Sequence, residues 1–91
     1  MFAVTRLRVP AADVPALSTA SAELLAVLRA RPGFRDGELG RAADDPELFA
    51  LYTRWDGVGA YRRALSAFEV KLAGGPVWAY AVDEPGVYLT E

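Results

Sequence analysis

The stretch from Asp44 to Asp56, DDPELFALYTRWD, constrains the fold of this chain more than any other segment. A strand formed here would carry apolar side chains on both faces, because successive residues of a strand point to opposite sides of the sheet. One face would present Phe49, Leu51, Thr53 and Trp55, and the other would present Leu48, Ala50, Tyr52 and Arg54. Amphipathic helices can cover only one face of a small sheet, so we expect a second copy of the chain to cover the other.

Length and charge narrow the class of protein. Residues 1–91 have the size of a single domain, and a chain this short buries only about 60–65% of the surface that its unfolded form exposes. Further burial by association is favoured, which again indicates a homodimer. The 10 basic residues are spread along the chain and the formal charge is −2, which argues against a nucleic-acid partner.

The chain contains no cysteine and no histidine. Disulfides, thiol nucleophiles, imidazole bases and the usual ligands of zinc, copper and haem iron are therefore excluded. The acidic run Asp44-Asp45-Pro46-Glu47 is explained by a turn in which Pro46 fixes the backbone before the strand. The sequence thus predicts neither a metal site nor a bound cofactor.

No segment predicts insertion into a membrane. The chain has no run of about 18 apolar residues, and its N-terminus begins with strand-like residues, without the pattern of a secretory signal. We expect a soluble, cytoplasmic protein without a membrane partner. The lack of cysteine is consistent with a reducing compartment.

The first half of the chain predicts a strand, a helix and a second strand. Phe2 to Val9 alternates and ends at Pro10. A helix then begins at Asp13, which can cap it, and ends before Pro32-Gly33; its apolar stripe is Val14, Leu17, Ser21, Leu24, Leu25 and Leu28. The strand from Gly33 to Ala42 contains Gly37 and Gly40, which indicate a bulge or the close approach of another backbone, and we place it at a sheet edge.

The second half predicts a strand, a helix and a short last strand. After the strand that ends at Trp55, Asp56 would cap a helix whose buried stripe is Val58, Tyr61, Leu65 and Phe68, with a possible extension to Leu72. Gly74-Gly75-Pro76 would break the chain, and the conformation of Val77 to Val82 is left open. Val87, Tyr88 and Leu89 can form the last strand.

This order predicts a ferredoxin-like βαββαβ domain of the α+β class, with a four-stranded antiparallel sheet. Right-handed crossovers would place both helices on the same face of the sheet. The opposite face would then be buried by the partner chain, and two sheets would close into a dimeric α+β barrel.

Several residue groups accompany this order: Pro32-Gly33-Phe34 with Gly37, the run from Asp44 through Phe49 and Tyr52 to Trp55, and Glu84-Pro85 with Tyr88. With them, the chain resembles the antibiotic biosynthesis monooxygenase family over nearly its whole length. The family includes cofactor-independent oxygenases of aromatic polyketide intermediates, haem-degrading enzymes, and members whose reaction is not established.

The resemblance implies a cavity between sheet and helices. Polyketide-type members line it with a tryptophan at the end of the third strand and a tyrosine six residues later, which Trp55 and Tyr61 match. Leu51 stands where those members carry an asparagine. The haem-degrading branch uses a histidine where this chain has Leu65 and Ser66, so haem degradation is excluded.

We therefore consider Trp55 and Tyr61 to be candidate catalytic residues. Candidate substrate-binding residues are Phe49, Leu51, Thr53, Phe68 and Arg62. Aromatic and apolar side chains would form the walls of the cavity, and the hydroxyls of Tyr61 and Thr53 would be hydrogen-bond donors. Two functions remain: a cofactor-independent monooxygenase of a small aromatic, and a dimeric domain of the same fold that binds an apolar ligand without catalysis.

Overall fold

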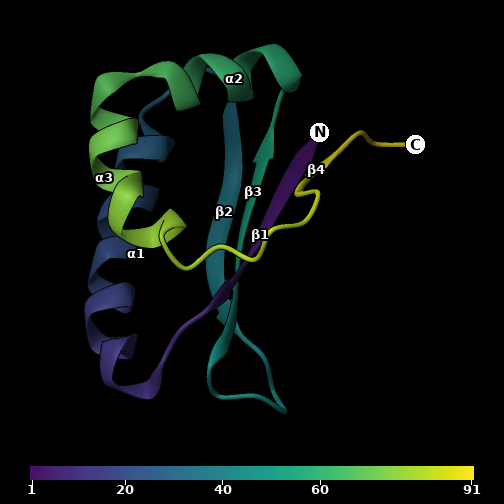
Figure 1. The fold of residues 1–91 in the computed structure, drawn as a ribbon. Helices are drawn as coiled ribbons and strands as arrows, with labels where there is room; N and C mark the ends of the chain where they lie inside the picture. The colour runs from purple at the N-terminus through teal and green to yellow at the C-terminus, as the bar shows by residue number, and fades with distance from the viewer.

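A four-stranded antiparallel sheet forms one layer of the computed structural model, which describes residues 1–91. The elements are β1 (Phe2–Arg8), a short 3-10 turn (Ala11–Asp13), α1 (Val14–Arg29), β2 (Phe34–Arg41), β3 (Leu48–Trp55), α2 (Val58–Ser66), α3 (Phe68–Trp78) and β4 (Val87–Tyr88). Figure 1 shows all three helices on the same side of the sheet, with α1 and α3 side by side and α2 at the end where β3 finishes. The predicted ferredoxin-like α+β fold is confirmed.

The sheet has the strand order β2-β3-β1-β4, so β2 lies at an edge as the sequence predicts. The register shift lies between Phe34 and Asp36, before the two glycines of β2. A Cβ at Gly37 would lie 3.0 Å from the Tyr52 carbonyl oxygen of β3, whereas a Cβ at Gly40 would meet open space. The predicted close approach of a second backbone is thus confirmed at Gly37 and wrong at Gly40.

The two faces of β3 differ as its sequence predicts. Phe49, Leu51, Thr53 and Trp55 are buried beneath the helices, whereas Leu48, Ala50 and Tyr52 are half-buried on the open face. Phe2 and Tyr88 continue this open face across β1 and β4, since both rings stack at a centroid distance of 5.3 Å and Phe2 lies 6.1 Å from the Tyr52 ring. An aromatic row therefore crosses three strands on the side that carries no helix.

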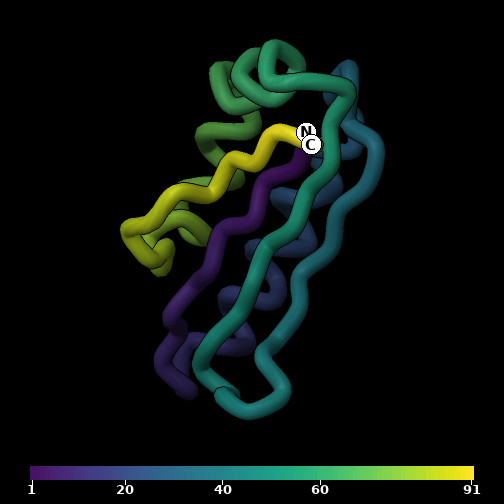
Figure 2. The backbone as a smooth tube through the Cα atoms, turned by 90° about the vertical axis from the view of Figure 1, so that its right-hand side faces the viewer, coloured from purple at the N-terminus to yellow at the C-terminus, as the bar shows by residue number.

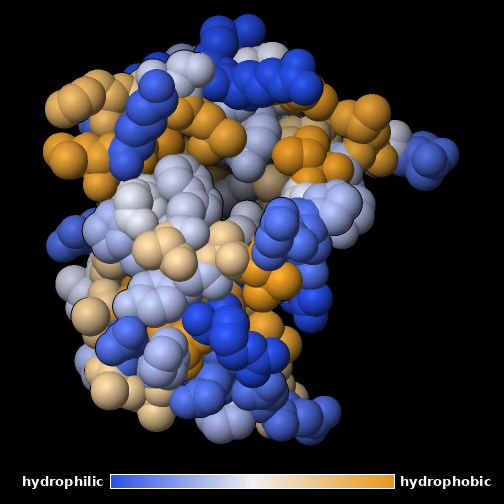
Figure 3. All heavy atoms as spheres, in the orientation of Figure 1, coloured by the Kyte–Doolittle hydropathy of each residue, from blue (hydrophilic) through white to orange (hydrophobic).

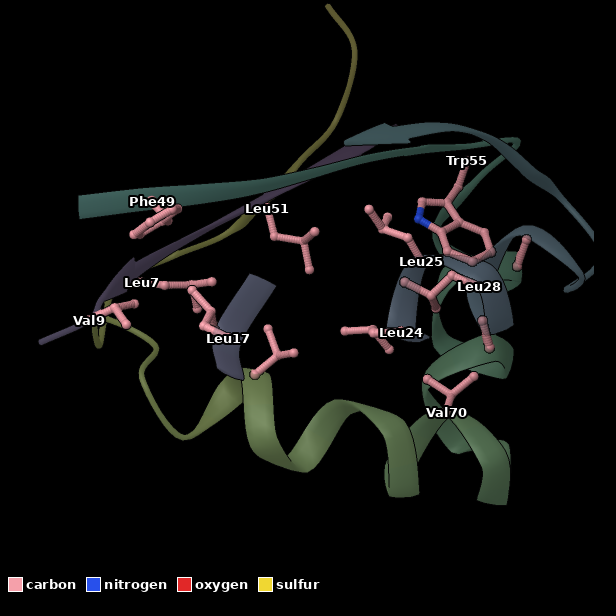
Figure 4. Close-up of a cluster of buried hydrophobic side chains, with 13 residues drawn as sticks. Leu7, Val9, Leu17, Leu24, Leu25, Leu28, Phe49, Leu51, Trp55 and Val70 are labelled. Atoms are coloured by element: carbon pink, nitrogen blue, oxygen red, sulfur yellow. The ribbon is translucent and has the colours of Figure 1, made fainter. Parts of the chain in front are cut away.

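Helix α1 supplies the largest part of the core (Figure 4). Its buried residues are Leu17, Ser21, Leu24, Leu25 and Leu28, which confirms the predicted stripe apart from Val14, which is half-buried. Ala11–Arg29 is long and apolar enough to cross a membrane by length and composition alone. Burial of its leucines against the sheet explains that hydropathy, because core helices of globular domains have the same composition.

The expected capping by Asp13 and Asp56 is wrong. Asp13 precedes α1 but its carboxylate accepts a hydrogen bond from the Tyr80 hydroxyl at 2.8 Å, and no side chain caps the helix. Gly57 precedes α2, while Asp56 forms an ion pair with Arg35. Both carboxylates bind partners that are distant in sequence, which the local pattern does not reveal.

The second predicted helix is two helices that pack through small residues. Ala67 is extended (ψ 137°) and separates α2 from α3. The buried positions are Ala60 and Ala64 of α2 and Val70, Gly74 and Val77 of α3. The predicted stripe is therefore right only in part: Tyr61 and Leu65 are half-buried and pack against the core, and Val58 is half-buried. It is wrong at Phe68 and Leu72, which are exposed.

Gly74-Gly75-Pro76 does not end the helix as expected, since α3 continues through all three residues to Trp78. A Cβ at Gly74 would lie 1.8 Å from the Trp78 indole, so this glycine makes room for the ring one turn later. The open question of Val77 to Val82 is settled in part by the helical conformation of Val77 and Trp78.

The C-terminal segment runs beside β1 as an interrupted edge of the sheet (Figure 2). Val82 donates its backbone N–H to the Arg6 carbonyl at 2.9 Å, and Val4 donates to the Gly86 carbonyl at 2.8 Å. The Arg6 guanidinium also holds the Glu84 carboxylate through two nitrogens, which lowers the pKa of Glu84. β1 is thereby paired along both of its edges.

Candidate functional site

Trp55 lies at the end of β3, where β2, α1 and α2 meet. Only 2% of its surface is exposed. The Phe34 ring contacts it edge to face at a centroid distance of 5.2 Å, and the Tyr61 ring does so at 5.8 Å. Figure 4 shows Leu25 and Leu28 of α1 beside the indole. Three aromatic rings from three separate elements thus form a cluster at this end of the core.

The polar group of Trp55 is satisfied within β3 itself. Its Nε1–H donates a hydrogen bond of 3.0 Å to the Thr53 hydroxyl oxygen, two residues earlier on the same face. Both residues are buried, and this bond fixes the orientation of the indole. The Thr53 hydroxyl accepts here, so its own hydrogen is free to donate to another group.

Tyr61 joins the cluster from the first turn of α2. Its ring is half-buried, and burial raises the pKa of its phenol above the ordinary value. A tyrosine phenol is protonated at neutral pH in any case, and desolvation disfavours the phenolate further, so Tyr61 is a hydrogen-bond donor. Tyr61 is the polar group of the cluster that lies closest to the surface.

The other predicted site residues are dispersed. Phe49 and Leu51 are buried further along β3, where the Arg41 guanidinium covers the Phe49 ring at 4.7 Å. Phe68 is 76% exposed at the start of α3, and Arg62 is exposed on α2. The structure thus brings Trp55, Tyr61 and Thr53 together and leaves Phe68 outside the core.

Sequence reasoning missed Phe34 as a member of the cluster. It belongs to the Pro32-Gly33-Phe34 group, and Gly33 adopts a positive φ of 88° that turns the chain into β2. The sequence carries no local signal for this contact, because it depends on how the turn at Gly33, four residues after α1 ends, directs β2.

Two hollows are present on the surface, and neither includes a residue of the aromatic cluster. One, of about 460 Å³, lies between the start of α1 and the β2–β3 hairpin, next to Arg41 and Asp45. The other, of about 290 Å³, lies around Leu48 and Ala50 on the open face of the sheet. Packed side chains fill the space beside Trp55. No group of three acidic side chains that could hold a metal ion is formed.

Comparison with models of known protein families identifies the family of this chain. A family model described as antibiotic biosynthesis monooxygenase matches residues 1–73. The chain belongs to the antibiotic biosynthesis monooxygenase family. This confirms the resemblance that the sequence carries.

Solved structures share the fold of this family member at low sequence identity. SnoaB from Streptomyces nogalater, described as a cofactor-independent oxygenase, superposes with a TM-score of 0.85 at 23% identity, covering 99% of this chain and 91% of that one. A conserved protein from Methanosarcina mazei Go1 has a TM-score of 0.79 at 15% identity, covering 94% and 84%. A search of curated proteins finds no significant match.

Proposed function

We propose that this antibiotic biosynthesis monooxygenase family member is a cofactor-independent monooxygenase. Its substrate would be a small aromatic of the anthrone or quinol type, bound in a pocket between sheet and helices. The observation that carries the proposal is the contact between Trp55 and Tyr61, the two positions at which the chain matches the polyketide-type members. The description of SnoaB as a cofactor-independent oxygenase supports the same reaction class.

Such a reaction demands little chemistry of the protein. The substrate loses a proton and supplies the electrons for its own attack on oxygen, so the site must exclude water and stabilise the oxyanion that proton loss creates. The phenol of Tyr61 would donate to this oxyanion, and burial, which raises its pKa, further disfavours loss of its own proton. The free hydrogen of the Thr53 hydroxyl would be a second donor.

Apolar side chains would hold the flat ring of the substrate. Trp55 is the central wall, Phe49 and Leu51 extend it along β3, and Phe68 and Arg62 would lie at the mouth of the pocket. Because packed side chains fill the space beside Trp55, binding requires the Tyr61 ring to swing away from the indole. Tyr61 is the member of the cluster with the most freedom to do so, since it is only half-buried.

A non-catalytic, dimeric ligand-binding domain of the same fold is the second candidate. The buried Leu51 favours it, because an apolar side chain at this place cannot orient a substrate hydroxyl. We infer a homodimer in either case, formed through the open face of the sheet around Leu48, Ala50 and Tyr52, and a cytoplasmic location.

Oxygen uptake with a panel of anthrones and hydroquinones, measured with metals chelated, tests the enzymatic proposal. Tyr61→Phe should keep the stability of the fold and lower turnover at least about tenfold, since it removes one oxyanion donor. Tyr88→Phe, which removes a hydroxyl from the opposite side of the sheet, is the matched control and should leave turnover unchanged. An unchanged rate for Tyr61→Phe would remove the phenol from the mechanism, and no uptake with any substrate would favour the binding domain.

A further inference from the structure

The outer side of α3 carries apolar side chains that nothing in the chain covers. Phe68 and Leu72 are 76% and 68% exposed, and Pro76 is exposed as well. Residues spaced by four lie on one face of a helix, so these three form a single stripe, which we call the α3 patch. The inner side of the helix buries Val70 and Val77 in the core. A helix that is apolar on both sides normally has cover on both sides.

Cations without ion pairs are present on α3 and on the helix that precedes it. Lys71 stands next to the α3 patch on its own helix, and Arg62 and Arg63 are exposed on the preceding helix, none of them in an ion pair. Glu69 is the sole carboxylate of both helices, and Arg31 engages it at 3.0 Å. Figure 3 shows hydrophobic atoms gathered over α3, with strongly hydrophilic atoms over α2 above them. This surface is thus cationic although the chain as a whole has a formal charge of −2.

The same charges disfavour a second copy of the chain as the occupant. In a two-fold contact the same patch faces itself, so Lys71 would approach its own copy without a carboxylate available to separate the two. Neither surface hollow lies at the patch, and therefore no groove is present to receive a protruding side chain. Phe68 and Leu72 project outward and must themselves enter an apolar medium.

We propose that the α3 patch binds an anionic lipid surface. Phe68 and Leu72 insert below the headgroups, while Lys71, Arg62 and Arg63 contact the negative charges of the lipids. Apolar insertion combined with nearby cations is the physical basis of reversible attachment to the anionic cytoplasmic leaflet. The proposal departs from the expectation of no membrane partner, which was based on the absence of a spanning or secretory segment, and a peripheral contact needs neither. This inference does not depend on whether the protein catalyses a reaction.

Flotation of the full chain with lipid vesicles tests the proposal. The protein should float with vesicles of phosphatidylcholine that contain phosphatidylglycerol, stay behind with phosphatidylcholine alone, and be released by salt. Phe68→Ser combined with Leu72→Ser should lower the bound fraction about tenfold or more, and Lys71→Glu should lower it on anionic vesicles. Both changes are at exposed positions, so circular dichroism should show an unchanged fold.

Two control variants distinguish lipid binding at the α3 patch from nonspecific association with vesicles. Leu89→Ser removes a leucine that is 70% exposed elsewhere on the molecule, and Arg41→Glu reverses an unpaired cation away from α3. Neither should alter flotation. The proposal is overturned if the wild-type protein does not float with anionic vesicles, or if the control variants reduce flotation as much as the α3 variants. Self-association that Phe68→Ser abolishes, without lipid binding, would assign the patch to a second copy instead.

Discussion

At the scale of single residues, the aromatic cluster shows which contacts a strand pattern can reveal. The alternation in β3 placed Phe49, Leu51, Thr53 and Trp55 on one buried face, and the structure confirms this. The hydrogen bond between Thr53 and Trp55 follows from the same geometry, because residues two apart share a face. The approach of Phe34 could not be predicted, since it depends on how the turn at Gly33 aims a different strand.

We expect Thr53→Val to destabilise the protein by about 1–3 kcal/mol, because the buried indole N–H of Trp55 would lose its acceptor. Chemical denaturation measures the effect. Thr5→Val is the matched control: this threonine lies half-buried on neighbouring β1, where its hydroxyl makes no hydrogen bond, and the change should be nearly neutral. Equal effects of the two substitutions would contradict a structural role for the Thr53 hydroxyl.

At the scale of elements, the sequence predicted every strand and α1 but misread the region after Asp56. Strong alternation and Pro or Gly boundaries define the strands, and leucines at helical spacing define α1. The buried face of α2 uses Ala60 and Ala64, and that of α3 combines Gly74 with Val70 and Val77, so three of the five buried positions carry little hydrophobic signal. The larger side chains of Phe68 and Leu72 face outward, so a search for apolar stripes selected the wrong face of α3.

Two glycine substitutions test the turn before β2 and the continuity of α3, and we expect them to change the stability in opposite directions. Gly33→Ala should cost about 1–3 kcal/mol, because φ is 88° and the new Cβ would lie 2.5 Å from the Ala60 Cβ. Gly75→Ala should stabilise the protein by about 0.5–1 kcal/mol, since this residue is helical and its Cβ would meet open space. Thermal unfolding measures both, and destabilisation by Gly75→Ala would mean that α3 does not continue through this residue.

At the scale of the whole molecule, the open face of the sheet dominates the behaviour that we expect in solution. Leu48, Ala50 and Tyr52 are half-buried in the isolated chain, and the stacked rings of Phe2 and Tyr88 lie beside them. The two-sided apolar pattern of β3 was sufficient to predict that this face is apolar. The pattern of one strand does not reveal which molecule covers the open face. The homodimer therefore stays a prediction.

Tyr52→Arg tests that prediction. An unpaired charge buried in the dimer contact costs about 3 kcal/mol or more, so the dissociation constant should rise by roughly a hundredfold. Light scattering over a range of concentrations measures it. Thr19→Arg, on the exposed side of α1, adds the same charge away from the open face and should leave association unchanged. A fully dimeric Tyr52→Arg protein would place the contact elsewhere.

The position of β1 between β3 and β4 has a consequence for synthesis of the protein. Residues 2–8 are synthesised well before their partners, residues 48–55 and 87–88. The nascent chain must therefore carry an unpaired β1 at least until β3 has left the ribosome. Such long-range pairing slows folding and leaves a strand edge that can template aggregation, so we expect this domain to need protection while it is being synthesised.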